Sequence, residues 1–554
     1  MGKVTSHINS SEMLSSIDLI NQSRGVNADI ASLSSQLAER AKSIKDFDSQ
    51  KITVSDGYDY APCINSALNS IYQYIFVPDG TYLIGSSILI PDNKRLILSY
   101  NATLVRYFTG TGSANATIRN VNQSSTTRNT NIGLFGGYVK SFDNTKTGKH
   151  IALWGVDDVK IDNIKIRDVY GDWSIHFRDC TGVIGKGIDI DTKGTDLFSD
   201  GLHITGGSKY VFSDLIIKSS DDCISLTVET AQDTNIDGVT ITNAHLTTTS
   251  SSVIKMTTKT GTTPTIKNVK IKNIIGVGGT TGQGESIVIK DEDNVGRISD
   301  IEVEASVDCS NGAGVGFRLQ GVNRIKGKID IKNPQGKGAD ISYSNDWKLA
   351  IRVDSPRTAG VSGISLNNVD DFELTPEIIN STLHGVAVGG VGTPVTNGKI
   401  INGKTKNSTN TGIRLINAVG VDVINHRCIS DVNGIIEDSG SDYNNIKNND
   451  VRTVTTTKVS LNGANSKARE NKGYITENRS TFQLNSASTS VTVAHGLAIA
   501  PSASGIDIRF RGNRGNVTKW WTANITSTNF DFVVDIAPGS IIDLSFEANA
   551  PKNI

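Results

Sequence analysis

The chain has 554 residues, which is too many for one ordinary globular domain. Its 55 Lys and Arg residues almost balance its 56 Asp and Glu residues, so it lacks the basic excess expected of a protein that binds nucleic acid or an anionic membrane. With 54 Gly, 11 Pro and many Asn, Ser, Thr, Val and Ile residues in its middle, the sequence favours strands and tight turns over helices.

Residues 1–45 form the first predicted element, a helical segment. Its apolar residues follow a spacing of four, three and four residues, and Arg40 occupies the one seam position that is not apolar. This spacing predicts a short coiled-coil neck, and the β-branched residues in it are compatible with three strands. The alternative is one amphipathic helix packed on its own chain. The apolar residues are Val26, Ile30, Leu33, Leu37 and Ile44.

Residues 46–100 are predicted to cap the start of a solenoid. After the segment IKDFDS, which begins at Ile44, a short helix is expected over Cys63–Asn69, followed by the strand-turn-strand sequence FVPDGTYLI over Phe76–Ile84. A helix followed by two strands can cover the open end of a first coil. This segment resembles the N-terminal module of pectate-lyase-like β-helices, including those of phage tailspikes.

Residues 101–466 are predicted to form the coils of a right-handed parallel β-helix, which makes the chain all-β. A small or polar residue followed by apolar-x-apolar recurs at intervals that subtraction gives as 24, 27, 24, 30 and 32 residues. Periods of this length, rich in β-branched residues and without intervening helices, are typical of such coils. The repeats begin at Ile164, Ile188, Leu215, Val239, Val269 and Ile301.

Residues 467–554 are predicted to be a polar linker followed by a small β domain. The linker is ARENKGYITEN, over Ala468–Asn478, and strands begin with SVTVAHGLAIAP at Ser490. Trp520 and Trp521 are adjacent, so on a strand they point to opposite faces and at most one belongs to a core. The segment resembles C-terminal modules of phage tail proteins, which implies trimerisation or carbohydrate contact.

The five cysteines are odd in number and widely scattered, and none forms a CxxC pair. We therefore expect buried free thiols rather than a disulfide framework or a zinc site, and we expect no metal and no cofactor. No apolar stretch approaches the ~20 residues that span a bilayer, and the N-terminus carries no secretion signal. These features predict synthesis in a reducing cytoplasm and no membrane insertion. The cysteines are Cys63, Cys180, Cys223, Cys309 and Cys428.

Equivalent positions on successive coils of a β-helix stack about 4.8 Å apart, so residues distant in sequence can form one site. Aligning the alternating apolar residues of one strand in each coil predicts three outward-facing rows. The first row is Trp173, Asp200, Asp222, Ser252 and Glu285; the second is His176, His203, Ser225, Lys255 and Val288; the third includes Arg178 and Lys290.

The first row predicts a catalytic site at Asp200 and Asp222, with Asp221 beside them. Three neighbouring carboxylates repel one another, which raises at least one pKa and separates an acid from a base, as glycosidic cleavage requires. The other outward residues are candidates for substrate binding, with Trp173 as a stacking platform for sugars. These candidates are Trp173, His176, Arg178, His203, Lys255, Glu285 and Lys290.

The segment SDGLHI followed by SDDCISL resembles the NTDG and GDDC motifs of polygalacturonase-type glycoside hydrolases, and Asp200 and Asp221 lie 21 residues, or one coil, apart. The resemblance implies that Asp221 is the general acid and that Asp200 and Asp222 activate water with inversion, for which carboxyl groups roughly 6.5–9.5 Å apart are expected. Lys290 matches the Lys of the family's RIK motif. Ser252 and Val288 stand where the family has His and Arg, so the sugar need not be a uronate.

Together these resemblances imply a homotrimeric phage tailspike, made in the host cytoplasm, attached to another tail component of the virion, and acting at the bacterial cell surface. Its expected activity is endo-acting hydrolysis of a capsular polysaccharide or a lipopolysaccharide O-antigen. A polysaccharide lyase on the same fold and a non-catalytic glycan-binding tail fibre are the alternatives. A site between subunits is a further alternative, for which the acidic candidates are Glu285, Asp291, Glu292 and Asp293.

Overall fold

The computed structural model describes residues 40–193, 198–278, 284–310, 312, 314–390 and 394–550. The chain divides into two compact units, Met1–Gln335 and Gly336–Ile554, which are described separately. Most of the coiled-coil seam predicted for residues 1–45 lies outside the described residues. Among those described, no helix is long and apolar enough to cross a membrane.

The first described elements show that the predicted neck ends too late. β1 (Ala41–Ser43) is a strand that pairs in parallel with β4 (Tyr74–Val77), and Ile44 is fully buried at the start of the 3₁₀ helix η1 (Ile44–Gln50). Ala41 and Ser43 are buried while Lys42 is half-buried, an alternation that suits a strand. These residues therefore start the first coil instead of continuing a helix.

The short helix and the two strands predicted for this segment are present. α3 (Ala61–Leu68) buries its apolar face, and the carboxylate of Asp59 accepts the backbone N–H groups of Ala61 and Gly85 at 2.9 and 2.7 Å. The helix is followed by β4 and β5 (Gly80–Ile84). Coils already begin within residues 46–100, because β7 (Arg95–Leu98) pairs in parallel with β4 and with β10 (Asn129–Phe135).

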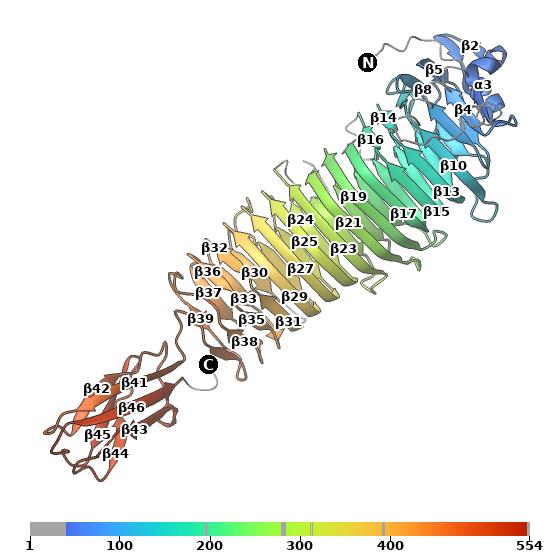
Figure 1. Cartoon of the computed structure of the whole chain (residues 1–554). Coiled ribbons are helices and arrows are strands. Elements are labelled where there is room, and N and C mark those ends of the chain that lie inside the picture. Colours follow the sequence, from blue (N-terminus) through green and yellow to red (C-terminus); the bar gives the residue numbers. More distant parts are fainter. Residues whose placement is uncertain are drawn as a thin grey trace, which may run out of the picture. The chain divides into compact units, whose positions relative to one another are not determined.

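The body of the first unit is a right-handed parallel β-helix, as predicted (Figure 1). One of its sheets carries the predicted outward rows, and we call it the site sheet. Its inward residues are buried and in the expected register, with Ile175 opposite Leu202, Leu202 opposite Ile224, and Ile224 opposite Ile254. The strands of the site sheet are β12 (Ile151–Trp154), β15 (Ile175–Lys186), β17 (Leu202–Ser219), β18 (Ile224–Val228), β20 (Ile254–Thr258), β22 (Glu285–Asp291) and β24 (Val315–Gln320), where β15 and β17 continue into neighbouring sheets.

The remaining sheets correct one of the predicted repeat intervals. Ile188 and Leu215 lie on one stacked row, but the residue opposite Leu215 is Ala244, and Val239 pairs with Tyr210. The interval from Leu215 to Val239 therefore joins two different sheets, because strands of both sheets share the apolar-x-apolar pattern. The strands concerned are β13 (Val156–Asp162), β14 (Lys165–Arg167), β16 (Asp189–Asp191), β19 (Ile236–Thr248), β21 (Ile266–Val277), β23 (Ile298–Asp308) and β25 (Val322–Lys332).

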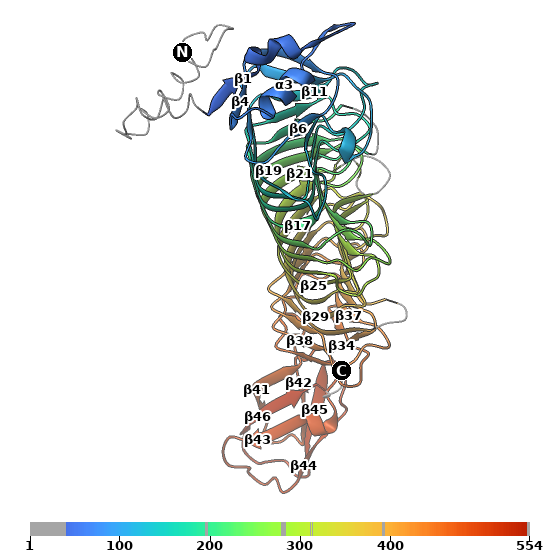
Figure 2. The same ribbon diagram turned by 90° about the vertical axis from the view of Figure 1, so that its right-hand side faces the viewer.

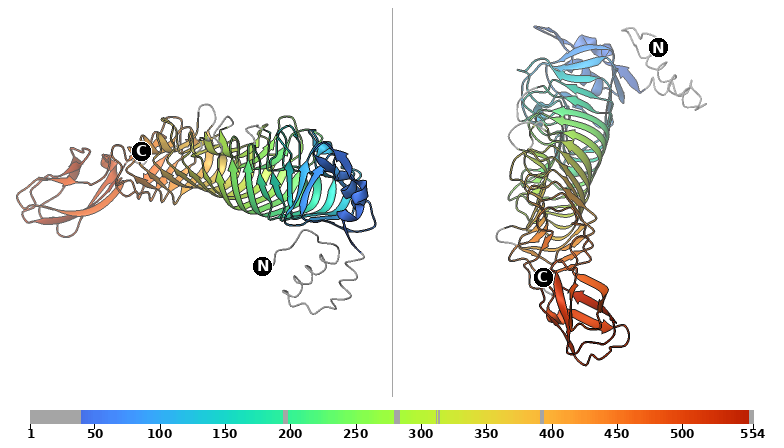
Figure 3. Two further views of the ribbon diagram at one scale, coloured as in Figure 1. Left: turned by 90° about the horizontal axis from the view of Figure 1, so that it is seen from above. Right: turned by 90° about the vertical axis from the view of Figure 1, so that its left-hand side faces the viewer.

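Asn and Asp residues make the bends between sheets. Asp214, Asn243 and Asn273 adopt positive φ angles of 57°, 56° and 54°, the left-handed region that Asn and Asp tolerate best after Gly. The amide of Asn273 donates to Asn243 Oδ1 at 2.8 Å, and the amide of Asn243 donates to Asp214 Oδ1 at 3.3 Å. This polar ladder explains the abundance of Asn at one-coil spacing, and Figure 3 gives two further views of the coils.

The second unit contains further parallel coils and a β-sandwich. β40 (Lys467–Arg469) still pairs in parallel with β38 (Asn445–Lys447), so the β-helix extends past the predicted boundary at residue 466. The other coil strands are β26 (Ala339–Ser342), β27 (Asn345–Asp354), β28 (Ile364–Asn367), β29 (Asp370–Ile379), β30 (His384–Val388), β31 (Val395–Ile401), β32 (Lys404–Lys406), β33 (Thr411–Leu415), β34 (Ala418–Val419), β35 (Asp422–Ile424), β36 (Arg427–Ile429), β37 (Asn433–Glu437) and β39 (Val459–Ser460).

The predicted C-terminal β domain is present as two three-stranded antiparallel sheets (Figure 2). Their core includes Phe530, Phe532 and Leu544, which are fully buried. Trp520 and Trp521 are 37% and 49% exposed, so neither is a core residue. The strands are β41 (Glu477–Leu484), β46 (Ile542–Asn549) and β43 (Ile506–Phe510) in one sheet and β42 (Ser490–Ala494), β45 (Asn529–Val534) and β44 (Trp520–Ala523) in the other.

Candidate active site

Asp200, Asp221 and Asp222 lie together just before strands β17 and β18 of the site sheet. Leu202 and Ile224 are in register, which places Asp200 and Asp222 on adjacent coils. The backbone N–H of Asp222 donates to Asp200 Oδ1 at 3.1 Å, and one carboxylate oxygen from each of the three residues lies within 4.8 Å of the others. The predicted cluster is therefore formed, but these oxygens are closer than the expected 6.5–9.5 Å.

Asp222 is the most firmly bound of the three. Its Oδ1 accepts the Ser251 hydroxyl at 2.7 Å and the Ser252 backbone N–H at 3.0 Å, and its Oδ2 accepts the Lys255 ammonium at 2.8 Å. Burial alone would lower the pKa of Lys255, but Asp222 outweighs that effect and raises it. The site sheet therefore holds Asp222 in an ion pair with a lysine that stays charged.

Asp221 has a different environment from Asp222. It is half-buried, and its backbone is fixed by the Ser219 hydroxyl, which accepts its N–H at 3.1 Å, and by the Thr248 hydroxyl, which donates to its carbonyl at 2.6 Å. Burial, followed by the charges of Asp200 and Asp222, raises the pKa of Asp221 to about 8. Asp221 thus holds a proton at neutral pH while remaining partly open to solvent.

Asp200 is almost completely buried and is bound to His203. Its Oδ2 lies 2.6 Å from His203 Nδ1, and His203 Nε2 lies 2.7 Å from the Thr227 hydroxyl. Burial and the charge of Asp222 raise the pKa of Asp200 well above its ordinary value. Burial and the charge of Asp222 thus disfavour ionisation of Asp200, whereas Asp222 has the Lys255 ammonium beside it at 2.8 Å.

Trp173 is partly exposed, but protein side chains lie over the faces of its ring. The His203 ring stacks on it with centroids 3.4 Å apart and an interplanar angle of 8°. The Lys149 ammonium lies 3.8 Å from the centre of the Trp173 ring. Because His203 covers one face of the ring, the ammonium lies over the other face. The sequence reveals an outward Trp but not what covers its faces.

His176 and Arg178 line the same sheet but are already bound to protein groups. His176 is 5% exposed, with Nδ1 3.1 Å from the Ser113 hydroxyl and Nε2 3.3 Å from the Thr205 hydroxyl. Arg178 donates to Asp233 at 3.1 Å and lies over the ring of Trp154. His176 also lies edge-on to the His203 ring, and Arg178 keeps a partly exposed side chain, so a role for either in substrate binding stays a prediction.

Glu285 and Lys290 lie two coils beyond Asp222. Glu285 forms an ion pair with Arg318 at 2.5 Å. Lys290 is in register with Thr257 and adds positive potential at Glu292. The lysine that contacts the cluster is therefore Lys255, not the Lys290 that the RIK resemblance indicates.

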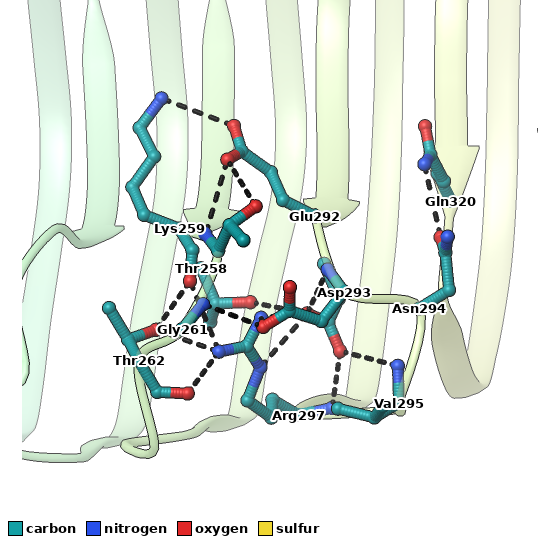
Figure 4. Close-up of polar contacts among 12 residues, drawn as sticks. Thr258, Lys259, Gly261, Thr262, Glu292, Asp293, Asn294, Val295, Arg297 and Gln320 are labelled. Carbon is teal, nitrogen blue, oxygen red and sulfur yellow. Dashed lines mark hydrogen bonds and ion pairs between the residues drawn. The ribbon is translucent and has the colours of Figure 1, made fainter.

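The acidic residues after Lys290 form a separate, structural cluster (Figure 4). Asp291 is fully buried and accepts the Arg297 backbone and side-chain N–H groups at 3.0 and 2.9 Å and the Thr258 hydroxyl at 2.9 Å. Asp293 accepts Arg297 and the Gly261 N–H, each at 2.9 Å. Both oxygens of Asp291 are bound by Arg297 and by neighbouring groups, so this carboxylate holds the turn in place, and a role for it at a site between subunits stays a prediction.

Several residues of the site have no motif in the sequence. The buried ion pair of Lys149 with Asp172 lies beside Trp173, and Ser251 and Thr227 bind the carboxylate cluster and its histidine. The exposed Glu229 adds negative potential at Asp200. One signal was available: Thr227 occupies the same outward row as Arg178, two residues after Ser225.

The carboxylate oxygens of the three Asp residues are close enough to share a cation. The Lys255 ammonium, which binds Asp222 Oδ2 at 2.8 Å, already supplies one positive charge to this cluster. The arrangement suits acid–base chemistry, because it places a partly exposed carboxylic acid beside a charged carboxylate.

Comparison with known proteins agrees with this chemistry. Residues 136–283 match the sequence model of the glycosyl hydrolases family 28. Polygalacturonase-2 of Solanum lycopersicum is 30% identical over 88 residues, which are 16% of this chain and 19% of that protein, so the chain spans about a fifth of the length of this curated relative. The matched segment contains all three Asp residues and Lys255 but ends before Glu285 and Lys290.

The fold is shared with a phage tailspike. A mutant tailspike protein of E. coli bacteriophage HK620 in complex with hexasaccharide is 13% identical and aligns over 93% of this chain and 94% of that chain, with a TM-score of 0.54. Another mutant of that tailspike, in complex with pentasaccharide, is 12% identical and aligns over 93% and 95%, with a TM-score of 0.52. This chain therefore has a tailspike-like parallel β-helix in which a segment similar to glycosyl hydrolases family 28 carries the carboxylate cluster.

Proposed function

We propose that this chain is a phage tailspike that hydrolyses a bacterial surface polysaccharide, either a capsule or an O-antigen, with Asp221 as the general acid. The observation that carries the proposal is the contrast between two adjacent residues. Asp221 is partly exposed with a pKa raised to about 8, whereas Asp222 is bound to Lys255 at 2.8 Å. An acid and a base held in different protonation states are the two groups that glycosidic hydrolysis needs.

In the proposed reaction Asp221 donates its proton to the glycosidic oxygen as the bond to the anomeric carbon breaks. A water molecule attacks that carbon, and Asp222 accepts the proton of the water. Asp200 orients the water instead of accepting its proton, because burial and the charge of Asp222 raise the pKa of Asp200 and so favour its protonated form. The resemblance implies that Asp200 and Asp222 activate the water together. We propose instead that Asp222 accepts the proton and Asp200 orients the water.

The stereochemistry rests on the motifs rather than on the spacing. The closest carboxylate oxygens lie within 4.8 Å, whereas inverting enzymes usually hold their carboxyl groups ~6.5–9.5 Å apart and retaining enzymes ~5–5.5 Å apart. Inversion remains our prediction from the resemblance. Proton NMR of the first product formed tests it, because the anomer released before mutarotation reports inversion or retention directly.

The substrate class and the assembly are part of the same proposal. The tailspike with the same fold has been solved in complex with a hexasaccharide and with a pentasaccharide, which supports a polysaccharide ligand here. We propose a homotrimer, made in the host cytoplasm and mounted on the virion through another tail component. Light scattering of the purified chain at micromolar concentration is expected to give the trimer mass, and a monomer mass would contradict the assembly.

The activity is tested by incubating the protein with a panel of purified capsules and O-antigens. We expect oligosaccharides with new reducing ends from at least one polymer, and release about 10²–10⁴-fold slower when Asp221→Asn replaces the wild type. Unsaturated products that absorb near 235 nm would instead identify a lyase. Tight binding without any release of oligosaccharide would identify a non-catalytic tail fibre.

A further inference from the structure

His203 lies beside the carboxylate cluster but cannot serve as a substrate ligand. It is 2% exposed, and both of its ring nitrogens are engaged, Nδ1 with Asp200 at 2.6 Å and Nε2 with Thr227 at 2.7 Å. Burial lowers the pKa of His203 to about 3, so the imidazole is neutral. A neutral ring that is bound at both nitrogens reaches the carboxylate cluster through its bond to Asp200.

The orientation of His203 is set by a stack of three side chains, which we call the Trp173 stack: Lys149, Trp173 and His203. The imidazole lies parallel to the indole at 3.4 Å, and the Lys149 ammonium lies 3.8 Å from the indole centre. His176 adds an edge-on contact to both rings, at 4.7 Å from Trp173 and 5.5 Å from His203. Aromatic contacts of this kind fix the plane of a ring as well as its position.

The far end of the stack is also fixed. Lys149 forms an ion pair with Asp172, and both side chains are almost fully buried. Asp172 additionally accepts the backbone N–H groups of Trp173 and Gly112, each at 2.9 Å. Because a buried ion pair requires well-defined geometry to offset its desolvation, this pair holds Lys149 over the indole with little freedom. The backbone and the ring of Trp173 are thus both immobilised.

We infer that His203 is a positioning residue for Asp200, and that the Trp173 stack sets the imidazole plane in which one proton is shared between His203 Nδ1 and Asp200 Oδ2. The effect on kcat that we expect rests on the proposed function, whereas the arrangement of the Trp173 stack does not depend on it. Its role is to keep Asp200 turned toward the backbone N–H of Asp222, and so to keep the two carboxyl groups in one arrangement.

Two matched substitutions of His203 separate positioning from filling of space. An Asn amide reaches the position of Nδ1 and can still share a proton with Asp200, whereas a Gln amide reaches the position of Nε2 and the Thr227 hydroxyl. Both lose the stacked ring. We expect His203→Asn to keep kcat within about tenfold of the wild type and His203→Gln to lose about 10²-fold or more, with KM changed less than about threefold in both. Equal kcat losses in the two variants would overturn the inference.

The stack is tested by a second pair at Trp173. Trp173→Phe keeps a flat ring for His203, and Trp173→Leu fills similar space without one. We expect the Leu variant to lose at least about tenfold more kcat than the Phe variant, at equal thermal stability. If kcat follows thermal stability in both variants instead, the stack has only a structural role and the inference fails.

An NMR measurement makes the inference independent of enzymatic activity. In the full chain labelled with ¹⁵N-histidine, His203 is expected to remain a neutral imidazole from about pH 8 to about pH 5, with one proton on the ring, and Asp200→Asn should change its ¹⁵N shifts. Titration of His203 near its ordinary pKa would overturn the stack. If no polysaccharide is cleaved while the NMR result holds, the proposed function has failed and the Asp200–His203 pairing has not.

Discussion

Two acidic clusters of the first unit have the same residue types and opposite electrostatics. Around Asp291, burial alone would raise the pKa, but hydrogen bonds from Arg297 and Thr258 outweigh it and lower the pKa below its ordinary value. Around Asp221, burial and two neighbouring carboxylates raise the pKa to about 8. The clusters differ in what their donors reach: Arg297 serves both Asp291 and Asp293, whereas Lys255 is bound to Asp222.

An acidic cluster with enough hydrogen-bond donors to stabilise all its carboxylates is typical of a structural role. A cluster with too few donors keeps a carboxyl group whose pKa is raised, and such a group can take part in acid catalysis. Every carboxylate oxygen of Asp291 is satisfied by fixed groups, so that cluster stabilises the turn after β22. In the site cluster, Asp221 is an additional carboxyl group beside the Asp222–Lys255 ion pair, whose two charges cancel. Ionisation of Asp221 is therefore unfavourable, so Asp221 keeps a proton that it can donate in acid catalysis.

The largest expected effect is on turnover. Asp221→Asn keeps the shape of the side chain but cannot donate a proton, so kcat should fall about 10²–10⁴-fold, and Asp222→Asn should fall comparably. The double variant should be far less than additive, because both groups act on one transition state. Glu292→Gln in the structural cluster is the matched control, and steady-state kinetics should show the wild-type kcat for it. A similar loss of kcat in Glu292→Gln would contradict the structural role of the second cluster.

The second effect is on stability and should follow the opposite order. Asp291→Asn leaves the buried Arg297 guanidinium without its main partner, a change that typically costs about 3–5 kcal/mol. Asp221→Asn should not destabilise the protein. Denaturant-induced unfolding of both variants measures the difference, and equal stabilities would contradict the structural assignment of Asp291.

A smaller effect is expected at Lys255. Lys255→Met keeps the length of the side chain but leaves the buried Asp222 without its cation, so Asp222 should take up a proton more readily and kcat should fall at least about tenfold. The optimum of kcat against pH should also become narrower on its acidic side. Lys290→Met, two coils away, is the control; if it lowers kcat as much as Lys255→Met does, Lys290 has the role that the resemblance gave it.

The smallest effect is the pH dependence of stability at Asp221. Because its pKa is raised in the folded state, the stabilising contribution is complete below the ordinary pKa of about 4 and is lost as the pH rises through about 8. Asn does not titrate. Asp221→Asn should therefore gain in melting temperature over the wild type as the pH rises from about 5 to about 9, by less than about 4 °C. A constant difference across this range would mean that the pKa of Asp221 is ordinary.

Much of the site sheet could be predicted from the sequence, because its strands alternate strictly. The register from Ile175 to Ile287 and the outward row from His176 to Val288 follow from that alternation and are confirmed. The step from Leu215 to Val239 was wrong, because local alternation does not distinguish the sheets of a β-helix. Periodicity predicts which face a residue takes, but not which sheet its strand joins.

The contacts within the site could be predicted only in part. The spacing of Asp200 and Asp222 brought the carboxylates together, but Lys149 and Asp172 precede the motifs and meet Trp173 through the fold. The sequence predicted Lys255 as a neighbour of the cluster and Lys290 as the counterpart of the family's lysine. Lys255 is the one that binds Asp222, and a motif match alone does not show which lysine side chain reaches the carboxylates. Burial of His203 and Asp200 depends on this three-dimensional context, and their protonation follows from it.

The central claim is that Asp221 holds a proton at neutral pH beside a charged Asp222. The infrared band of protonated carboxyl groups, recorded as a difference between wild type and Asp221→Asn from about pH 6 to about pH 10, tests it directly. The account predicts a band at neutral pH that is lost with a midpoint near pH 8 and is missing in the variant. A difference spectrum without this band at neutral pH would contradict it, because Asp221 would then be ionised and could not be the acid.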